Sequence, residues 1–102
     1  MTTEQKIQHI ADHYGYEPQS RQLIEEMAEL TVAINKAWRK TFDAVDKLPN
    51  MDDEERIVEE IADVEIMLRQ IKYLLGVDED ELSQIAERKL DRQIERIKNA
   101  VH

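Results

Sequence analysis

The chain has 102 residues and a mass of 12.1 kDa, which suffices for one domain over residues 1–102 and not for two. Its 23 acidic and 14 basic residues give a formal net charge of −9, which argues against binding to a nucleic acid polymer or to an anionic membrane. Cysteine is absent, no apolar run approaches the ~18 residues of a membrane span, and the first ten residues lack an apolar signal segment. The presence of only 2 Gly and 2 Pro argues against a sheet-rich fold. Together these features predict a cytoplasmic all-α domain.

Residues that begin and end helices divide the chain into four helical segments and one loop. Gly15 and Gly76 stand where two helices should stop, because glycine readily adopts the conformations that close a helix. Asp78 is a suitable cap for the last helix, and Pro49 with Asn50 indicates a loop. The expected segments are helices over residues 3–14, 18–42, 53–75 and 78–101, with the loop over residues 43–53.

The last three segments each carry apolar residues at helical spacing. Helices of twenty-odd residues are about 30 Å long, so these apolar stripes are long for so small a chain. A single layer of four helices would leave one side of the stripes in water. We therefore expect a protomer of the four-helix-bundle type, assembled as a homodimer or as a homotetramer formed from two dimers. The residues expected to face inward are Leu23, Met27, Leu30, Ile34, Ala37 and Trp38; Ile57, Ile61, Val64, Leu68, Ile71 and Leu75; and Leu82, Ala86, Leu90, Ile94, Ile97 and Val101.

Two acidic pairs border the apolar stripes of the second and third helices. Glu26 and Glu29 lie about 60° apart around their helix, and so do Glu60 and Asp63. When the two helices pack through their stripes, the four carboxylates can face a common groove. Two unit charges about 4 Å apart repel by about 4 kcal/mol at an effective dielectric of about 20, so protonation, a basic partner or a cation must offset the repulsion. Carboxylate oxygens suit Mg²⁺, with Mn²⁺ as an alternative.

The same residues have a simpler interpretation. Glutamate is a good helix former, and glutamate-rich helix faces are commonly just solvated. Basic residues on the last helix allow two interpretations as well. Lys89, Arg92 and Arg96 fall within an arc of about 60° that borders the apolar stripe, where they can hold phosphate oxygens. They can equally form a solvated basic face, which the helix dipole favours near a C-terminus.

Taken together, the acidic and basic motifs resemble the MazG-like branch of the all-α nucleoside triphosphate pyrophosphohydrolases. The similar stretches are QLIEEMAEL at residues 22–30, EEIADV at residues 59–64 and KLDR at residues 89–92. The chain departs from the family at Gln93, where the family usually has Asn. The 30 residues between Glu29 and Glu60 also form a longer separation than is usual for the family.

The resemblance implies Mg²⁺-dependent hydrolysis of nucleoside or deoxynucleoside triphosphates to a monophosphate and pyrophosphate, by a dimer or a tetramer. It implies that the metal ligands are Glu26, Glu29, Glu60 and Asp63. Lys89 and Arg92 would contact the triphosphate, and Glu25 would be an acidic neighbour of the site. A carboxylate that the metal does not saturate can take a proton from the attacking water, and either Glu29 or Glu25 suits this catalytic role.

Two further residues are candidates for binding the nucleoside. Gln19 precedes the first acidic motif and either lines a base pocket or packs within the turn. Trp38 either stacks on a nucleobase or belongs to the core or a subunit interface. Two other functions stay open: a related phosphoribosyl-ATP pyrophosphohydrolase, and a non-catalytic acidic helical dimer that binds a partner protein.

Overall fold

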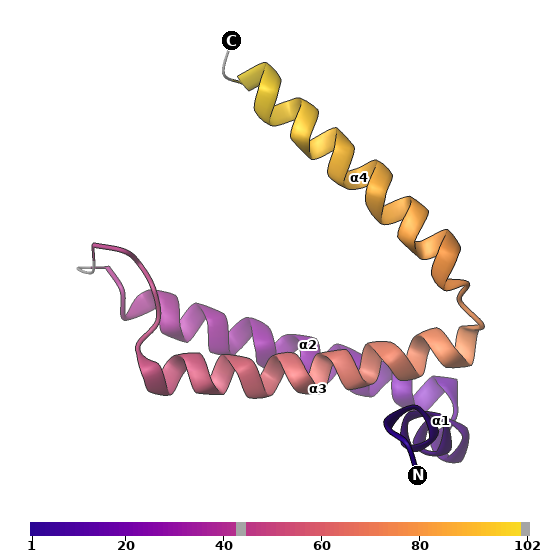
Figure 1. Cartoon of the computed structure of the whole chain (residues 1–102). Coiled ribbons are helices and arrows are strands. Elements are labelled where there is room, and N and C mark those ends of the chain that lie inside the picture. The colour runs from indigo at the N-terminus through magenta and orange to yellow at the C-terminus, as the bar shows by residue number, and fades with distance from the viewer. Residues whose placement is uncertain (43–44, 101–102) are drawn as a thin grey trace.

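A computed structural model describes residues 1–42 and 45–100 of the chain. The described residues form four helices and no strand, which confirms the expected all-α class (Figure 1). The helices are α1 (Thr3–Tyr14), α2 (Tyr16–Arg39), α3 (Met51–Leu75) and α4 (Glu79–Ala100). None of these helices combines the length and the apolarity that crossing a membrane requires.

Local side-chain and backbone contacts fix the helix ends close to the predicted positions. The Asn50 side chain accepts a hydrogen bond from the Asp53 amide at 2.8 Å, so α3 begins two residues before the predicted start. Gly76 ends α3 in the left-handed conformation, with φ 64°, and the Val77 amide donates to the Lys72 carbonyl at 2.9 Å. The Asp78 carboxylate accepts from the Asp80 amide at 2.9 Å at the start of α4.

Helices α2 and α3 form an antiparallel pair that runs side by side along most of their lengths (Figure 1). Ala33 and Ala37 of α2 are buried against α3, and Val64 and Met67 of α3 are buried in the described fold. Small side chains on one helix let the larger ones on the other approach closely. This pair supplies most of the core of a single chain.

The short helix α1 lies across one end of this pair and packs mainly on α3. Ile7 and Ala11 are its buried residues. Two polar contacts tie its exposed side to α3: the Arg69 guanidinium lies 2.7 Å from the Glu4 carboxylate, and the Tyr73 hydroxyl donates to the Asp12 carboxylate at 2.9 Å. These contacts hold a helix that would be marginal by itself.

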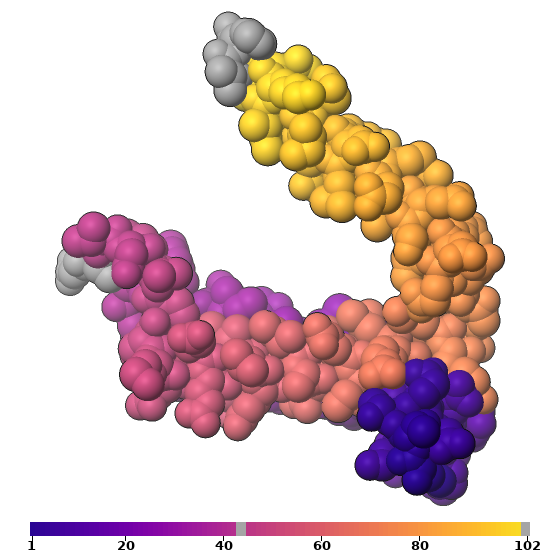
Figure 2. All heavy atoms as spheres, in the orientation of Figure 1, coloured from indigo at the N-terminus to yellow at the C-terminus, as the bar shows by residue number. Residues whose placement is uncertain are grey.

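Helix α4 leaves the other three helices after Gly76 and projects away from them (Figure 2). It has no buried residue and packs on none of α1, α2 and α3. An ion pair of 2.9 Å between Lys72 and Glu79 joins its first turn to the end of α3. The residues of α4 that were expected to face inward, from Leu82 to Ile97, are therefore not buried in the described chain, and Val101 lies outside the described residues.

The α2–α3 pair has two different sides. At about 100° per residue, Met27 and Ile34 are turned about a quarter turn from the face of α2 that contacts α3. Ile61 and Leu68 are turned by the same amount on α3, and because the helices are antiparallel both sets lie on one side of the pair. These four residues were expected to be inside, yet each is exposed, because the described helices place nothing over this side. Glu29 and Asp63 lie on the opposite side.

Candidate metal centre

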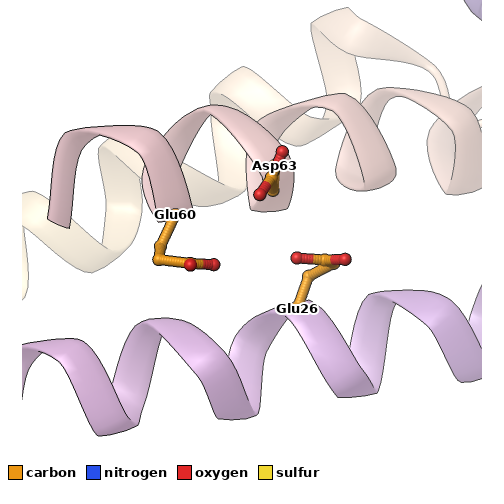
Figure 3. A group of neighbouring side chains, drawn as sticks. All are labelled: Glu26, Glu60 and Asp63. Carbon is orange, nitrogen blue, oxygen red and sulfur yellow. The ribbon is translucent and has the colours of Figure 1, made fainter. Parts of the chain in front are cut away.

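Three carboxylates from the two paired helices converge on one point (Figure 3). Glu26 projects from α2, and Glu60 and Asp63 project from α3. One oxygen of each lies within 4.8 Å of one oxygen of each of the others. Since α2 and α3 meet through their apolar residues, side chains that border the contact on both helices are forced together, as the phase of the two acidic pairs predicted.

Glu60 is the most deeply placed member of this carboxylate cluster. Its side chain is only 6% exposed. One of its oxygens, Oε1, lies 3.0 Å from Nε of Arg56, while Oε2 is buried and has no hydrogen-bond partner among the described residues. A buried carboxylate oxygen without a partner is costly, so this atom indicates a missing positive or hydrogen-bonding group. In Figure 3 the Glu60 carboxylate points into the space between Glu26 and Asp63.

The surroundings of Glu60 raise the pKa of its carboxyl group above the ordinary value of 4.5. Burial is the largest cause, because it disfavours the charged form, and the nearby carboxylates of Glu29, Asp63 and Glu26 act in the same direction. The guanidinium of Arg56 opposes them. One arginine thus does not fully compensate the buried negative charge.

Two residues support the cluster that the sequence analysis did not single out. Arg56 lies one turn before Glu60 on α3, and its terminal nitrogen is also 3.8 Å from a Glu29 oxygen across the helix pair. Gln22 lies one turn before Glu26 on α2 and donates a hydrogen bond of 2.8 Å to it. Both occur at the i, i+4 spacing of neighbours on a helix, which is the sequence signal that could have found them.

A cavity of about 560 Å³ adjoins the cluster on the same side of the helix pair. It is lined by the charged residues Glu25, Glu29 and Lys36 of α2 and Arg56 of α3. The short side chains of Ala28, Val32 and Ala33 also line it. The volume is in the range of small-molecule sites in proteins. Two of the predicted acidic residues, Glu25 and Glu29, thus face a space beside the cluster.

The cluster fits a hard divalent cation. All three donors are carboxylates, which suit Mg²⁺ or Mn²⁺ better than the softer metals that prefer His or Cys. The three oxygens are close enough to reach such an ion by small side-chain rotations. Binding a cation would compensate the buried oxygen of Glu60 that has no hydrogen-bond partner among the described residues.

Glu29, the fourth ligand that the resemblance implies, is not part of the three-carboxylate cluster. It forms an ion pair with Arg56, whose terminal nitrogen lies 3.8 Å from a Glu29 oxygen. The Glu29 side chain is 58% exposed, so it remains beside the cluster with freedom to rotate. Its separate position agrees with the alternative role of a base that the metal does not saturate.

Neither of the two predicted nucleoside-binding residues lines the cavity. Gln19 is buried between α2 and α3, where its amide donates a hydrogen bond of 2.7 Å to the buried side chain of Gln70. Trp38 is 55% exposed near the end of α2 and stacks edge-on against Phe42, with ring centres 4.9 Å apart. It borders a separate hollow with Val32 and Asn35.

The two predicted phosphate-binding residues, Lys89 and Arg92, are exposed on α4. Because α4 packs on neither α2 nor α3, a single chain does not bring these cations to the carboxylate cluster. The structure therefore assembles the acidic part of the expected site and leaves its basic part on a separate helix.

Comparison of the chain with family models, with curated proteins and with solved structures gives no match. The similarity to the MazG-like family rests on the motifs quoted from the sequence.

Proposed function

We propose that the chain is a Mg²⁺-dependent nucleoside triphosphate pyrophosphohydrolase of the MazG-like kind, with Mn²⁺ as an alternative metal. The observation that supports this most is the convergence of the carboxylates of Glu26, Glu60 and Asp63, because Glu60 also has a buried oxygen without a partner among the described residues. On a solvated acidic face the carboxylates would stay in water, because burying one of them close to two others is unfavourable. The order of the acidic and basic motifs along the chain supplies the reaction class.

In this proposal Glu26, Glu60 and Asp63 hold the divalent ion. A bound ion of this kind neutralises phosphate charge and orients the reacting groups. Glu29 or Glu25 takes a proton from the water that attacks the α phosphorus, since both line the cavity beside the cluster and neither belongs to it. The bond between the α and β phosphates breaks, and pyrophosphate leaves with the bonding electrons.

Lys89 and Arg92 stabilise the charge that builds on the departing pyrophosphate. Their helix is unpacked in the single chain, and the apolar side of the α2–α3 pair is uncovered as well. Both features support assembly as a homodimer or a dimer of dimers, in which apolar residues of α4 are covered. A basic helix supplied across a subunit interface would complete the site.

A substrate panel tests the proposal directly. Purified protein is incubated with each NTP and dNTP, and with phosphoribosyl-ATP, in the presence of Mg²⁺. We expect a monophosphate and pyrophosphate from at least one NTP or dNTP, and no reaction in EDTA. Release of a diphosphate and orthophosphate would contradict the mechanism. Activity on phosphoribosyl-ATP alone would select the related histidine-pathway reaction, and absence of all hydrolysis would favour the non-catalytic dimer.

Metal dependence is tested without substrate. Millimolar Mg²⁺ should raise the melting temperature, because a ligand that binds only the folded state stabilises it. The control is a monovalent salt at equal ionic strength, which screens the repulsion without occupying a site. Equal effects of the two salts would contradict a shared metal site.

A further inference from the structure

We propose that Arg56 and Lys36 form a binding subsite for a chain of phosphates in the cavity beside the carboxylate cluster. This inference rests on the proposed function and extends it, because it adds two cations from outside the acidic and basic motifs. It concerns polyphosphate groups in general, whether free or attached to a nucleoside.

Arg56 reaches from α3 over the edge of the cavity toward α2. Its Nε faces Glu60 at 3.0 Å, and its terminal nitrogen is 3.8 Å from Glu29. The side chain nevertheless remains 61% exposed. A guanidinium has five N–H donors in a planar fork, so donors remain for a ligand in the cavity. The same group therefore borders both the carboxylate cluster and the adjoining cavity.

Lys36 lines the same cavity, two turns after Glu29 on α2. Seven residues of helix return nearly to the same face, about 10 Å further along the axis. Among the described residues, no carboxylate lies within ion-pair distance of Lys36. The other residues that line the cavity include short apolar side chains, which leave room for a bulky ligand.

The balance of charge couples this subsite to the metal. Five carboxylates border the cluster and the cavity, namely Glu25, Glu26, Glu29, Glu60 and Asp63. They outnumber the two cations, so without a divalent ion the site repels a polyanion. A divalent cation on the cluster reduces the repulsion, and it also competes with Arg56 for the charge of Glu60. Metal and polyphosphate should therefore each raise the affinity for the other.

Another hollow, at the other end of α3, serves as a control for the proposed subsite. It has a volume of about 220 Å³ and also has an arginine and a lysine on its lining, Arg69 and Lys72 of α3. There each cation has its own carboxylate partner, Glu4 at 2.7 Å and Glu79 at 2.9 Å. The composition is similar, but no buried unpartnered carboxylate oxygen lies beside it among the described residues.

The test measures binding of inorganic tripolyphosphate by calorimetry in excess Mg²⁺, and binding of Mn²⁺ alone, to the full chain. The double variant Arg56→Gln/Lys36→Gln should lose at least about tenfold of its tripolyphosphate affinity, since two charge-assisted contacts to phosphate are lost. Its affinity for Mn²⁺ should not fall, because two positive charges are removed near the ion. The matched control Arg69→Gln/Lys72→Gln should change neither affinity. Arg56→Lys should retain part of the tripolyphosphate affinity, because the charge stays and the fork is lost.

Several outcomes would overturn the inference. Equal losses in the two double variants would mean that general charge explains the binding. Loss of Mn²⁺ affinity with unchanged tripolyphosphate affinity would mean that Arg56 only positions Glu60. No tripolyphosphate binding to the unmodified chain would also refute it. If the unmodified chain hydrolyses nucleotides and Arg56→Gln/Lys36→Gln binds tripolyphosphate with unchanged affinity, the subsite is refuted and the proposed function is not. A chain that binds tripolyphosphate through Arg56 and Lys36 but hydrolyses nothing would refute the enzyme and keep the subsite.

Discussion

The α2–α3 pair and helix α4 carry similar amphipathic sequences but differ in burial. Val64 and Met67 of α3 are buried, whereas α4 has no buried residue over its 22 residues. The difference shows that an apolar stripe specifies a need for burial without specifying the partner. Helices α2 and α3 run antiparallel and cover each other. Gly76 instead directs α4 away from them.

The same contrast divides the proposed site. The three carboxylates proposed to bind the metal come together within one chain, because both helices that carry them pack together. Lys89 and Arg92 are not, because their helix has no packing partner in that chain. Substitutions in the α2–α3 pair and in α4 should therefore impair different properties of the protein.

The largest effect is expected at Glu60. Replacing it by Gln removes a charge with little change in volume, so the helices should keep their fold. Loss of even an indirect metal contact typically costs 10–100-fold, so we expect activity to fall at least about 100-fold and Mg²⁺ stabilisation to disappear. Glu54→Gln, in the exposed first turn of α3, should change neither. Equal effects of the two variants in the pyrophosphate assay would show that the site is misplaced.

Arg92→Ala on α4 should lower turnover about 10–100-fold and leave Mg²⁺ affinity unchanged. The expected contact of Arg92 is with phosphate rather than with the carboxylates, and α4 packs on neither α2 nor α3. Arg92→Lys should restore activity only in part, because the planar fork is lost. The measurements are steady-state kinetics and titration with Mg²⁺. A parallel loss of metal affinity would mean that α4 lies against the carboxylate cluster in the working assembly.

Alanine substitution in the two regions distinguishes burial within a chain from burial between chains. Met67→Ala should cost about 2–5 kcal/mol in the free energy of unfolding, because Met67 is buried in a single chain. Ile94→Ala should change an isolated chain by no more than about 0.5 kcal/mol, since Ile94 is 52% exposed.

We expect a dimer or larger, so Ile94→Ala should make the melting temperature depend more steeply on protein concentration. Light scattering and thermal unfolding at several concentrations measure this. A single 12.1 kDa species, with Ile94→Ala neutral at every concentration, would leave α4 without a partner and weaken the enzyme proposal.

Gln70→Ala tests the polar part of the α2–α3 contact. It removes the buried acceptor of the Gln19 amide and should cost about 1–3 kcal/mol. The double variant Gln19→Leu/Gln70→Leu should cost less than the sum of its single variants, because no buried amide is then left unpaired. Urea denaturation of the unmodified chain, of Gln70→Ala, of the two single Leu variants and of the double variant gives the comparison. An additive result would show that the two amides act independently.

The smallest effect is a dependence of stability on pH in the absence of metal. Since burial raises the pKa of Glu60, the folded chain holds that proton more tightly than the unfolded chain. The contribution of Glu60 to stability is thus complete below about pH 4.5 and is lost as pH rises through the raised pKa. Glu60→Gln should lack this decline. Denaturation in EDTA across this pH range measures it, and identical slopes in the two proteins would contradict the burial of a charged Glu60.

The helix ends and the phase of the acidic residues could be read from the sequence because they depend on local geometry. Gly76 closes α3 by its own backbone freedom, and Asn50 begins α3 by a side chain three residues from its partner. The regular helical turn also fixed on which side of each stripe Glu26, Glu60 and Asp63 would lie. These are short-range properties, so the bounds of α1 and the positions of these three carboxylates around their helices could be predicted without knowledge of the fold.

Only the tertiary structure decided which groups meet across helices. It separated Glu29 from the cluster and gave it Arg56 as a neighbour, and it buried Gln19 against Gln70. It left Met27, Ile61 and the whole apolar stripe of α4 uncovered in one chain. Such pairings depend on how far each helix is rotated and where the chain turns, and contacts between residues 27 to 51 positions apart leave no local trace in the sequence. The physical reason is that a helix specifies its own faces, whereas burial requires a second surface.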